Sequence, residues 1–251
     1  MMPEKTNLHK KLVTLKDTSP LAESFRTLKT NIQFSSIDSE IKTMVVTSSQ
    51  PGEGKSLTTC NLGLTMARSG MEVLLIDGDL RKPTMHKYFL LSNAEGLTNL
   101  LIDDALTIES VGQNIMDNLT VLPSGPIPPN PTELLQTRKM KRLLDQFKDH
   151  YDLIIIDSPP VMAVADASVL SILADGTIMV VGYGSSSRDL AVKAKEQLQM
   201  VKANILGVVI NKVPMNGQGY YQYYYYSEEK DKRTKKNRLI DIIKKKLSKK
   251  E

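Results

Sequence analysis

The sequence predicts an α/β fold, a doubly wound and mostly parallel sheet with helices on both faces. Two observations carry the prediction. Apolar runs of strand length alternate with helix-like stretches along the chain, and runs such as "LIIID" and "IMVVG" are continuous rather than alternating. Continuous apolar runs are typical of parallel strands that are buried on both faces. With 251 residues, of which 41% are apolar, the chain is long enough to form one substantial core.

Six runs are expected to form strands, and they cover residues 42–49, 72–77, 118–125, 151–157, 176–184 and 205–213. A helix is expected over residues 130–147, between the third and fourth of these runs. Asn130 is placed to cap this helix, Pro131 suits its first position, and Glu133 would complete a capping box. Another helix follows a glycine-rich loop that comes directly after the first run.

A helix with a marked start is also expected over residues 19–34, where Ser19 would be the cap and Pro20 the first helical residue. The apolar side chains on one face of this helix are Leu21, Phe25, Leu28 and Ile32. Glu23, Arg26 and Lys29 lie away from that stripe. They are either ordinary solvated charges or contacts to another subunit.

The net charge of +5 belongs to the end of the chain. Residues 227–251 contain 11 Lys/Arg and 5 Asp/Glu, whereas residues 1–226 contain 22 and 23. A nucleic-acid-binding domain would have its basic surface on the folded body, so we expect no nucleic-acid partner. The basic segment is either a solvated tail or a weakly amphipathic contact with anionic lipid or an acidic partner.

The remaining composition favours a cytoplasmic protein. No apolar run approaches the ~20 residues of a membrane-spanning helix, and no secretory signal is visible near the first residue. The single cysteine, Cys60, cannot form an internal disulfide and is expected to be a buried thiol. The three histidines show no metal-ligand spacing.

The segment "SSQPGEGKS", residues 48–56, contains the Walker A arrangement that defines a P-loop NTPase, with Ser49 in place of its first glycine. Small residues let backbone N–H groups surround phosphates, and the start of the following helix adds its positive end. Lys55 is expected to reach the β- and γ-phosphates of ATP and to be solvated when nucleotide is absent. Ser56 is expected to ligate Mg²⁺. The expected ATP-binding residues of this loop are Gly52, Glu53, Gly54, Lys55, Ser56 and Leu57.

Carboxylates end two of the expected strands, where they could hold magnesium. "YDLIIIDSPP" ends a buried strand in Asp157, a Walker B carboxylate, and "EVLLIDGDLRKP" ends another in Asp77, followed by Asp79. Ligands of open α/β sheets bind at the carboxyl ends of the strands. The hard oxygen ligands that Mg²⁺ prefers are therefore expected from Asp79 and Asp157 together with Ser56.

The segment "GYYQYYYY", residues 219–226, contains six of the nine tyrosines of the chain. Adjacent rings of a strand would point to opposite sides, so these rings cannot all face one core. The surrounding glycine, asparagine and glutamine residues indicate a loose loop. The segment is either an adhesive tail without catalytic meaning or an accessible substrate for phosphorylation. The candidate phosphorylation sites are Tyr220, Tyr221, Tyr223, Tyr224, Tyr225 and Tyr226.

The combination of "SSQPGEGKS", "LLIDGDLRKP", "LIIIDSPP" and the tyrosine-rich segment resembles the bacterial tyrosine kinases of capsule and exopolysaccharide synthesis, over the chain to about residue 226. "ESFRTLKTN" is similar to the oligomerisation motif of that family. Glu23, Arg26 and Asn31 match the motif, while Lys29 replaces an arginine and cannot form the same bidentate fork. The resemblance implies a P-loop ATPase fold that is unrelated to the eukaryotic kinases.

The resemblance also implies roles for the site residues. Asp77 would orient or deprotonate the attacking tyrosine hydroxyl, and Asp79 and Asp157 would hold magnesium directly or through water. Catalysis, to which Lys55 also contributes, would come mainly from positioning and charge neutralisation around the γ-phosphate of ATP. Asn211 is either an adenine-recognising residue or an asparagine that merely ends a strand.

The domain organisation that follows has four parts: an N-terminal extension (1–16), a P-loop kinase domain (17–215, with an oligomerisation helix at 17–35), the tyrosine-rich tail (216–229) and a basic extension (230–251). The resemblance implies a homo-oligomer, a ring that phosphorylates its own tails between subunits. It further implies a separate transmembrane activator that recruits the kinase to the inner face of the membrane, a cognate tyrosine phosphatase, and protein substrates of polysaccharide synthesis.

Two other functions are compatible with a P-loop. A partitioning or cell-division-site ATPase usually has an early lysine in the loop, where this chain has Gln50 and Pro51. An iron–sulfur scaffold ATPase would need a Cys-x-x-Cys pair, which one cysteine cannot supply. The tyrosine-rich segment distinguishes the kinase from both, so the positioning ATPase is the alternative to the kinase.

Overall fold

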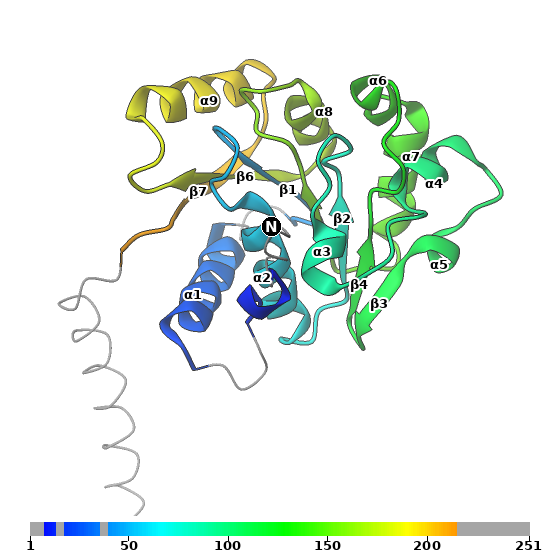
Figure 1. Cartoon of the computed structure of the whole chain (residues 1–251), viewed down its shortest axis with the longest axis horizontal. Coiled ribbons are helices and arrows are strands. Elements are labelled where there is room, and N and C mark those ends of the chain that lie inside the picture. The colour runs from blue at the N-terminus through cyan, green and yellow to red at the C-terminus, as the bar shows by residue number, and fades with distance from the viewer. Residues whose placement is uncertain (1–7, 14–17, 36–39, 215–251) are drawn as a thin grey trace, which may run out of the picture. The chain divides into compact units, whose positions relative to one another are not determined.

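The computed structural model divides the chain into two compact units, residues 1–212 and 213–251. It describes residues 8–13, 18–35 and 40–214, and the helices and strands of these residues are drawn in Figure 1. The strands are β1 (Thr43–Ser48), β2 (Val73–Asp77), β3 (Gln113–Met116), β4 (Leu119–Leu122), β5 (Leu153–Asp157), β6 (Gly176–Gly182) and β7 (Ile205–Asn211). The helices are η1 (Leu8–Lys11), α1 (Pro20–Ser35), α2 (Lys55–Ala67), α3 (Met85–Phe89), α4 (Leu97–Ile102), α5 (Ile108–Val111), α6 (Pro131–Leu135), α7 (Arg138–Phe147), α8 (Asp166–Leu173) and α9 (Arg188–Met200).

The described strands form one sheet in the order β3-β4-β2-β5-β1-β6-β7. All neighbouring pairs are parallel except β3 and β4, which are antiparallel. The predicted doubly wound, mostly parallel sheet is therefore confirmed, and each of the six expected runs contains a strand. The sequence did not predict β3, a four-residue strand with the sequence Gln-Asn-Ile-Met at the edge of the sheet.

Helices cover both faces of the sheet, as predicted (Figure 1). Successive residues of a strand point to opposite faces, so each strand contributes to two cores. On one face, Met44 of β1 and Ile155 of β5 pack with α1, α2 and α3. On the other face, Val45 and Ile154 pack with helices α4 to α8, and β6 packs with α9. Complete burial of β1, β2 and β5 explains why their sequences are apolar without alternation.

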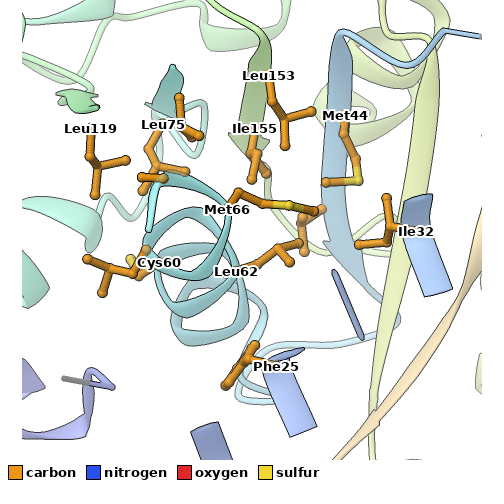
Figure 2. Packing of buried hydrophobic residues seen from close by; sticks show 14 of the residues in the cluster. Phe25, Ile32, Met44, Cys60, Leu62, Met66, Leu75, Leu119, Leu153 and Ile155 are labelled. Carbon is orange, nitrogen blue, oxygen red and sulfur yellow. The ribbon is translucent and has the colours of Figure 1, made fainter. Parts of the chain in front are cut away.

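Helix α2 lies between α1 and the sheet, as Figure 2 shows. Cys60, Leu62 and Met66 of α2 are at most 1% exposed, and Phe25 of α1 packs in the same cluster. Burial of each of the Leu62, Met66 and Phe25 side chains contributes roughly 1.5–3 kcal/mol. Cys60 is the buried thiol that the sequence predicts, and burial raises its pKa well above the ordinary value. The packing fixes α2, and with it the glycine loop from which α2 begins.

The helix expected over residues 130–147 is two helices, α6 and α7. The chain turns at Thr137, whose hydroxyl oxygen accepts a hydrogen bond from the Met140 amide at 3.2 Å and caps α7. The proposed capping box at Asn130 is wrong. The Asn130 side chain accepts no capping hydrogen bond and instead donates to a Glu133 carboxylate oxygen at 3.0 Å. The predicted start of α6 at Pro131 is confirmed.

The start of α1 agrees with the sequence, because the Ser19 hydroxyl oxygen accepts from the Ala22 amide at 3.3 Å. The apolar stripe is shifted by one residue at this end. Phe25 and Ile32 are buried, whereas Leu21 is 44% exposed and Ala22 is buried instead. None of the helices in the described ranges combines the length and the apolar character that crossing a membrane requires.

Asp175 closes the sheet at the amino ends of its strands, the edge opposite the glycine loop. One carboxylate oxygen accepts from the Thr43 amide at 2.8 Å and the Lys42 amide at 3.1 Å, and the other accepts from Lys148 Nζ at 3.2 Å. Burial opposes ionisation of Asp175, but the hydrogen bonds from Thr43 and Lys148 outweigh it, so the pKa of Asp175 is lowered.

Candidate active site

The glycine loop joins β1 to α2, as the Walker A pattern predicts. Gly54 precedes α2 with a φ of 91°, a left-handed conformation that favours glycine. A Cβ at Gly54 would lie 2.2 Å from Nδ2 of Asn211, so a side chain is excluded there on steric grounds as well. The first amides of α2, at Lys55, Ser56 and Leu57, have no acceptor within the helix. They are the donors that a phosphate at a helix start requires.

The Glu53 side chain holds the loop in shape from inside the protein. Glu53 is 1% exposed, and its carboxylate accepts from Ser49 Oγ at 2.9 Å, from the Gln50 amide at 2.9 Å and from the Gly182 amide at 3.0 Å. The Ser186 hydroxyl donates to it as well. Burial opposes ionisation of Glu53, but the hydrogen bonds from Ser186, Gln50 and Gly182 outweigh it and lower its pKa. The sequence identified Glu53 as part of the loop but not this supporting role.

Asn211 ends β7 beside the loop. Its Nδ2 donates to the Glu53 carbonyl oxygen at 2.9 Å, and its Oδ1 accepts from the Lys212 amide at 2.8 Å. Asn211 therefore ties the last strand to the phosphate loop. Recognition of adenine by Asn211 stays a prediction.

The three predicted aspartates come together next to the loop. Asp77 and Asp157 are the last residues of β2 and β5, and they are partners in the register of these adjacent strands. Lys55 Nζ lies 3.0 Å from Asp79 Oδ2, 3.3 Å from Asp157 Oδ2 and 3.3 Å from Ser56 Oγ. The expectation that Lys55 is solvated without nucleotide is wrong. Its side chain is 12% exposed, because the ammonium group lies between the two buried carboxylates of Asp79 and Asp157.

Asp77 differs from the other two carboxylates in its hydrogen bonds. Its Oδ2 accepts from the amides of Thr84 and Met85 at 3.0 and 2.9 Å, which fixes the start of α3. Its Oδ1 is buried and has no partner among the described residues. Burial, with the adjacent charge of Asp157, raises the pKa of Asp77 to about 7. Asp77 thus has a buried oxygen without a hydrogen bond and titrates near neutral pH.

Burial also raises the pKa of Asp157, against the attraction of Lys55. Burial works against the charge of Lys55, but Asp157 and Asp79 outweigh it and raise the pKa of the lysine. In the nucleotide-free site, the ammonium group of Lys55 is therefore surrounded by buried carboxylates.

No group of three or more His, Cys, Asp or Glu side chains in the described ranges is arranged to hold a metal ion on its own. Magnesium is usually held by one or two carboxylates, waters and the phosphates of a substrate. The oxygen donors next to the loop are Ser56 Oγ and the carboxylates of Asp79 and Asp157, which share Lys55 as their partner. They suit a metal that arrives with a nucleotide.

The polar residues of the predicted oligomerisation motif lie outside the apolar stripe of α1, as the sequence pattern indicates. Arg26 and Asn31 are exposed, Glu23 and Lys29 are half-buried, and Arg26 forms an ion pair with Glu23 one turn earlier. The tyrosines at 220–226 and the basic extension lie outside the described residues.

Comparisons with known proteins identify the family. A family model described as an AAA domain matches residues 41–212. The chain is 44% identical over 202 residues to a protein of Bacillus subtilis named tyrosine-protein kinase YwqD. The aligned region covers 80% of this chain and 85% of that protein. This chain is also 37% identical over 223 residues to a Staphylococcus aureus protein named putative tyrosine-protein kinase CapB. Here the aligned region covers 89% of this chain and 98% of that protein.

Solved structures agree with the sequence relatives. The chimerical protein CapA2B2 superimposes with a TM-score of 0.78 at 39% identity, over 82% of this chain and 91% of that one. The kinase domain of the Escherichia coli tyrosine kinase ETK gives a TM-score of 0.72 at 32% identity, over 78% of each chain. With a P-loop, paired strand-end aspartates and these relatives, the chain belongs to the AAA-domain family and, within it, to the bacterial P-loop tyrosine kinases.

Proposed function

We propose that this kinase transfers the γ-phosphate of ATP to tyrosines 220–226 of neighbouring copies of itself, and that this reaction regulates the synthesis and export of capsule or exopolysaccharide. The observation that carries the proposal is the cluster at the end of the phosphate loop. Lys55 lies within 3.0 and 3.3 Å of Asp79 and Asp157, beside the unpartnered oxygen of Asp77. Such a cluster supplies both phosphate binding and a proton acceptor.

Nucleotide binding would redistribute the charges of the site. The amides of Lys55, Ser56 and Leu57 would donate to phosphate oxygens, and Lys55 would leave the carboxylates for the β- and γ-phosphates. When bound, Mg²⁺ would neutralise charge on these phosphates, held by Ser56, Asp79 and Asp157 directly or through water. The ion pairs of Lys55 thus offset part of the charge of the buried carboxylates until the nucleotide arrives.

Asp77 would accept the proton of the attacking tyrosine. The tyrosine oxygen forms a bond to the γ-phosphorus, the bond from the γ-phosphorus to the bridging oxygen breaks, ADP leaves, and the proton passes to Asp77 Oδ1. A phenol with a pKa of about 10 is mostly protonated at neutral pH, so an acceptor with a pKa of about 7 assists as the charge develops.

The partners follow from the same proposal. Four polar residues of α1, the charged Glu23, Arg26 and Lys29 and the neutral Asn31, would contact the next subunit of a ring. A separate transmembrane protein would activate the cytoplasmic kinase and recruit it to the inner face of the membrane. A cognate phosphatase would reverse the modification, and further protein substrates would belong to polysaccharide synthesis.

The test is incubation of the purified full chain with Mg-ATP, with and without the cytoplasmic segment of a candidate membrane activator, followed by phosphotyrosine mass spectrometry. Phosphate should appear on residues 220–226 and should be absent from Lys55→Met. ATP hydrolysis without any phosphotyrosine would instead favour a nucleotide-switched positioning ATPase.

A further inference from the structure

The loop that carries Asp79 is held in place by a buried carboxylate outside the phosphate site, Asp166 of α8. Asp166 is 0% exposed, and it accepts two hydrogen bonds from one guanidinium, from Arg81 Nε at 2.8 Å and from Arg81 Nη2 at 3.2 Å. Paired hydrogen bonds of this kind fix both distance and orientation. The hydroxyl of Thr132 in α6 donates to the same carboxylate and accepts from Arg81 Nη2 at 2.9 Å.

Arg81 connects this carboxylate to the site through a very short loop. Asp79 lies two residues before Arg81, and its Oδ1 accepts from the Lys82 amide at 3.0 Å. Leu80, between them, is 0% exposed. The loop is thus fixed at its start by β2, in its middle by a buried side chain and at its end by the fork on Asp166. Asp79 Oδ2 has little freedom to leave its position 3.0 Å from Lys55 Nζ.

The hydrogen bonds of Asp166 indicate that it holds the loop of Asp79 and Arg81 in place rather than capping its own helix. The carboxylate lies in the first turn of α8, where the helix dipole favours a negative charge. Among the described residues, its hydrogen-bond donors are nevertheless side chains of other segments, Arg81 and Thr132, and none is an amide of α8. A buried carboxylate is costly unless it is paired and hydrogen-bonded. Arg81 and Thr132 satisfy both requirements.

We propose that Asp166 is a positioning residue for phosphotransfer, which acts through Arg81 to set the place of the Asp79 carboxylate. This inference rests on the proposed role of Asp79 in holding magnesium. Asp166 is hydrogen-bonded to Arg81 and Thr132 and is not among the residues proposed to hold phosphate or metal. It determines how well the metal-binding geometry is formed before the nucleotide arrives.

The first test is Asp166→Asn in the full chain, which keeps the size of the side chain and removes its charge. Groups that orient metal ligands typically change metal affinity by 10–100-fold. We expect the gain in affinity that Mg²⁺ gives to a non-hydrolysable fluorescent ATP analogue to fall about tenfold. Affinity for the analogue in EDTA should stay within about twofold, because the glycine loop is unchanged. The magnesium concentration for half-maximal self-phosphorylation should rise in parallel.

The second test asks whether Asp166 acts through Arg81. Arg81→Gln should reproduce the effect, and the double variant should be no worse than either single one. Residues that act as a unit are not additive, whereas two independent tenfold losses would multiply to about a hundredfold. A hundredfold loss in the double variant would overturn the proposed route. Should Asp166→Asn fail to fold, Arg81→Lys keeps a charge at a partly exposed position and removes only the fork, and it should show the same loss.

Two further variants make the outcome specific. Asp175→Asn is the matched control, a hydrogen-bonded aspartate at the opposite edge of the sheet, and its magnesium dependence should equal that of the wild type. Asp79→Asn should lose the magnesium effect more completely than Asp166→Asn. If Asp79→Asn leaves the magnesium effect intact, the proposed metal role fails. If Asp79→Asn abolishes it and Asp166→Asn does not change it, only the positioning role is refuted.

Discussion

Asp77→Asn should stabilise the nucleotide-free protein while it removes phosphotransfer. The pKa of Asp77 rises from an ordinary 3.8 to about 7, chiefly because the carboxylate is buried. A group whose pKa is raised by folding stabilises the fold fully only below its unfolded pKa, and that stability is lost as the pH rises through the folded pKa. Ionised Asp77 therefore opposes folding, and the opposition grows between about pH 4 and pH 7.

The size of the effect follows from the same pKa. A difference of about three units, at about 1.4 kcal/mol each, amounts to roughly 4 kcal/mol at pH 8 and roughly 1.6 kcal/mol at pH 5. An asparagine keeps an oxygen for the Thr84 and Met85 amides, but its NH₂ group must find a partner. We therefore expect a gain of about 2–4 kcal/mol at pH 8, or roughly 4–16 °C in Tm for a chain of this size.

The assay is thermal unfolding in EDTA at pH 5 and pH 8, monitored by circular dichroism. The control is Asp175→Asn, because the pKa of Asp175 is lowered by folding. Its stabilisation is present above the unfolded pKa and is lost only as the pH falls below about 4. Asp175→Asn should thus destabilise by about 1–3 kcal/mol equally at both pH values. A Tm of Asp77→Asn that equals the wild type at pH 8 would refute the account of Asp77 as a carboxylate held at about pKa 7.

Three further predictions concern the loop and the oligomer. Lys55→Met should abolish phosphotransfer and also lower stability by about 3 kcal/mol, measured by urea unfolding, because it leaves two buried carboxylates without a cation. Unchanged stability would show that the ion pairs of Lys55 contribute nothing. Glu53→Gln should weaken binding of the ATP analogue about tenfold in EDTA, since each lost hydrogen bond of a charged group costs about 1.5 kcal/mol or more; calorimetry that finds equal affinity would remove Glu53 from loop support. Arg26→Ala with Lys29→Ala should shift the oligomer towards monomer in light scattering, and an unchanged mass would return both residues to solvated charges.

The sequence predicted the strands of the central sheet well because each can be recognised from a short stretch of residues. Buried parallel strands need continuous apolar runs, and a glycine loop before a helix has few alternatives. β3 was missed because four residues, of which only two are apolar, are too few to show a strand pattern. The helix over 130–147 was predicted as continuous because neither glycine nor proline follows Pro131 in this segment, and only the hydrogen bond to Met140 reveals that the chain begins a new helix at Thr137.

The candidate site was predicted in its members but not in its connections. Strand-end positions brought Asp77 and Asp157 together without further information. The pairing of Lys55 with carboxylates was missed, because the sequence does not show how a buried site balances its charge in the absence of nucleotide. Asp166 was missed entirely. It follows no strand and belongs to no motif, and its importance comes from a contact across 85 positions of the chain.

The central claim, a kinase that phosphorylates the tyrosine segment of its neighbours, is tested most directly with two full-length chains that differ in mass. Lys55→Met is produced with heavy nitrogen, mixed with unlabelled wild-type protein and incubated with Mg-ATP before mass spectrometry. Heavy phosphotyrosine should appear on residues 220–226 only when the wild-type chain is present. Phosphate confined to the light peptides of the mixture would contradict transfer between subunits. Phosphate on heavy Lys55→Met incubated without the wild-type chain would contradict the proposed role of the phosphate site.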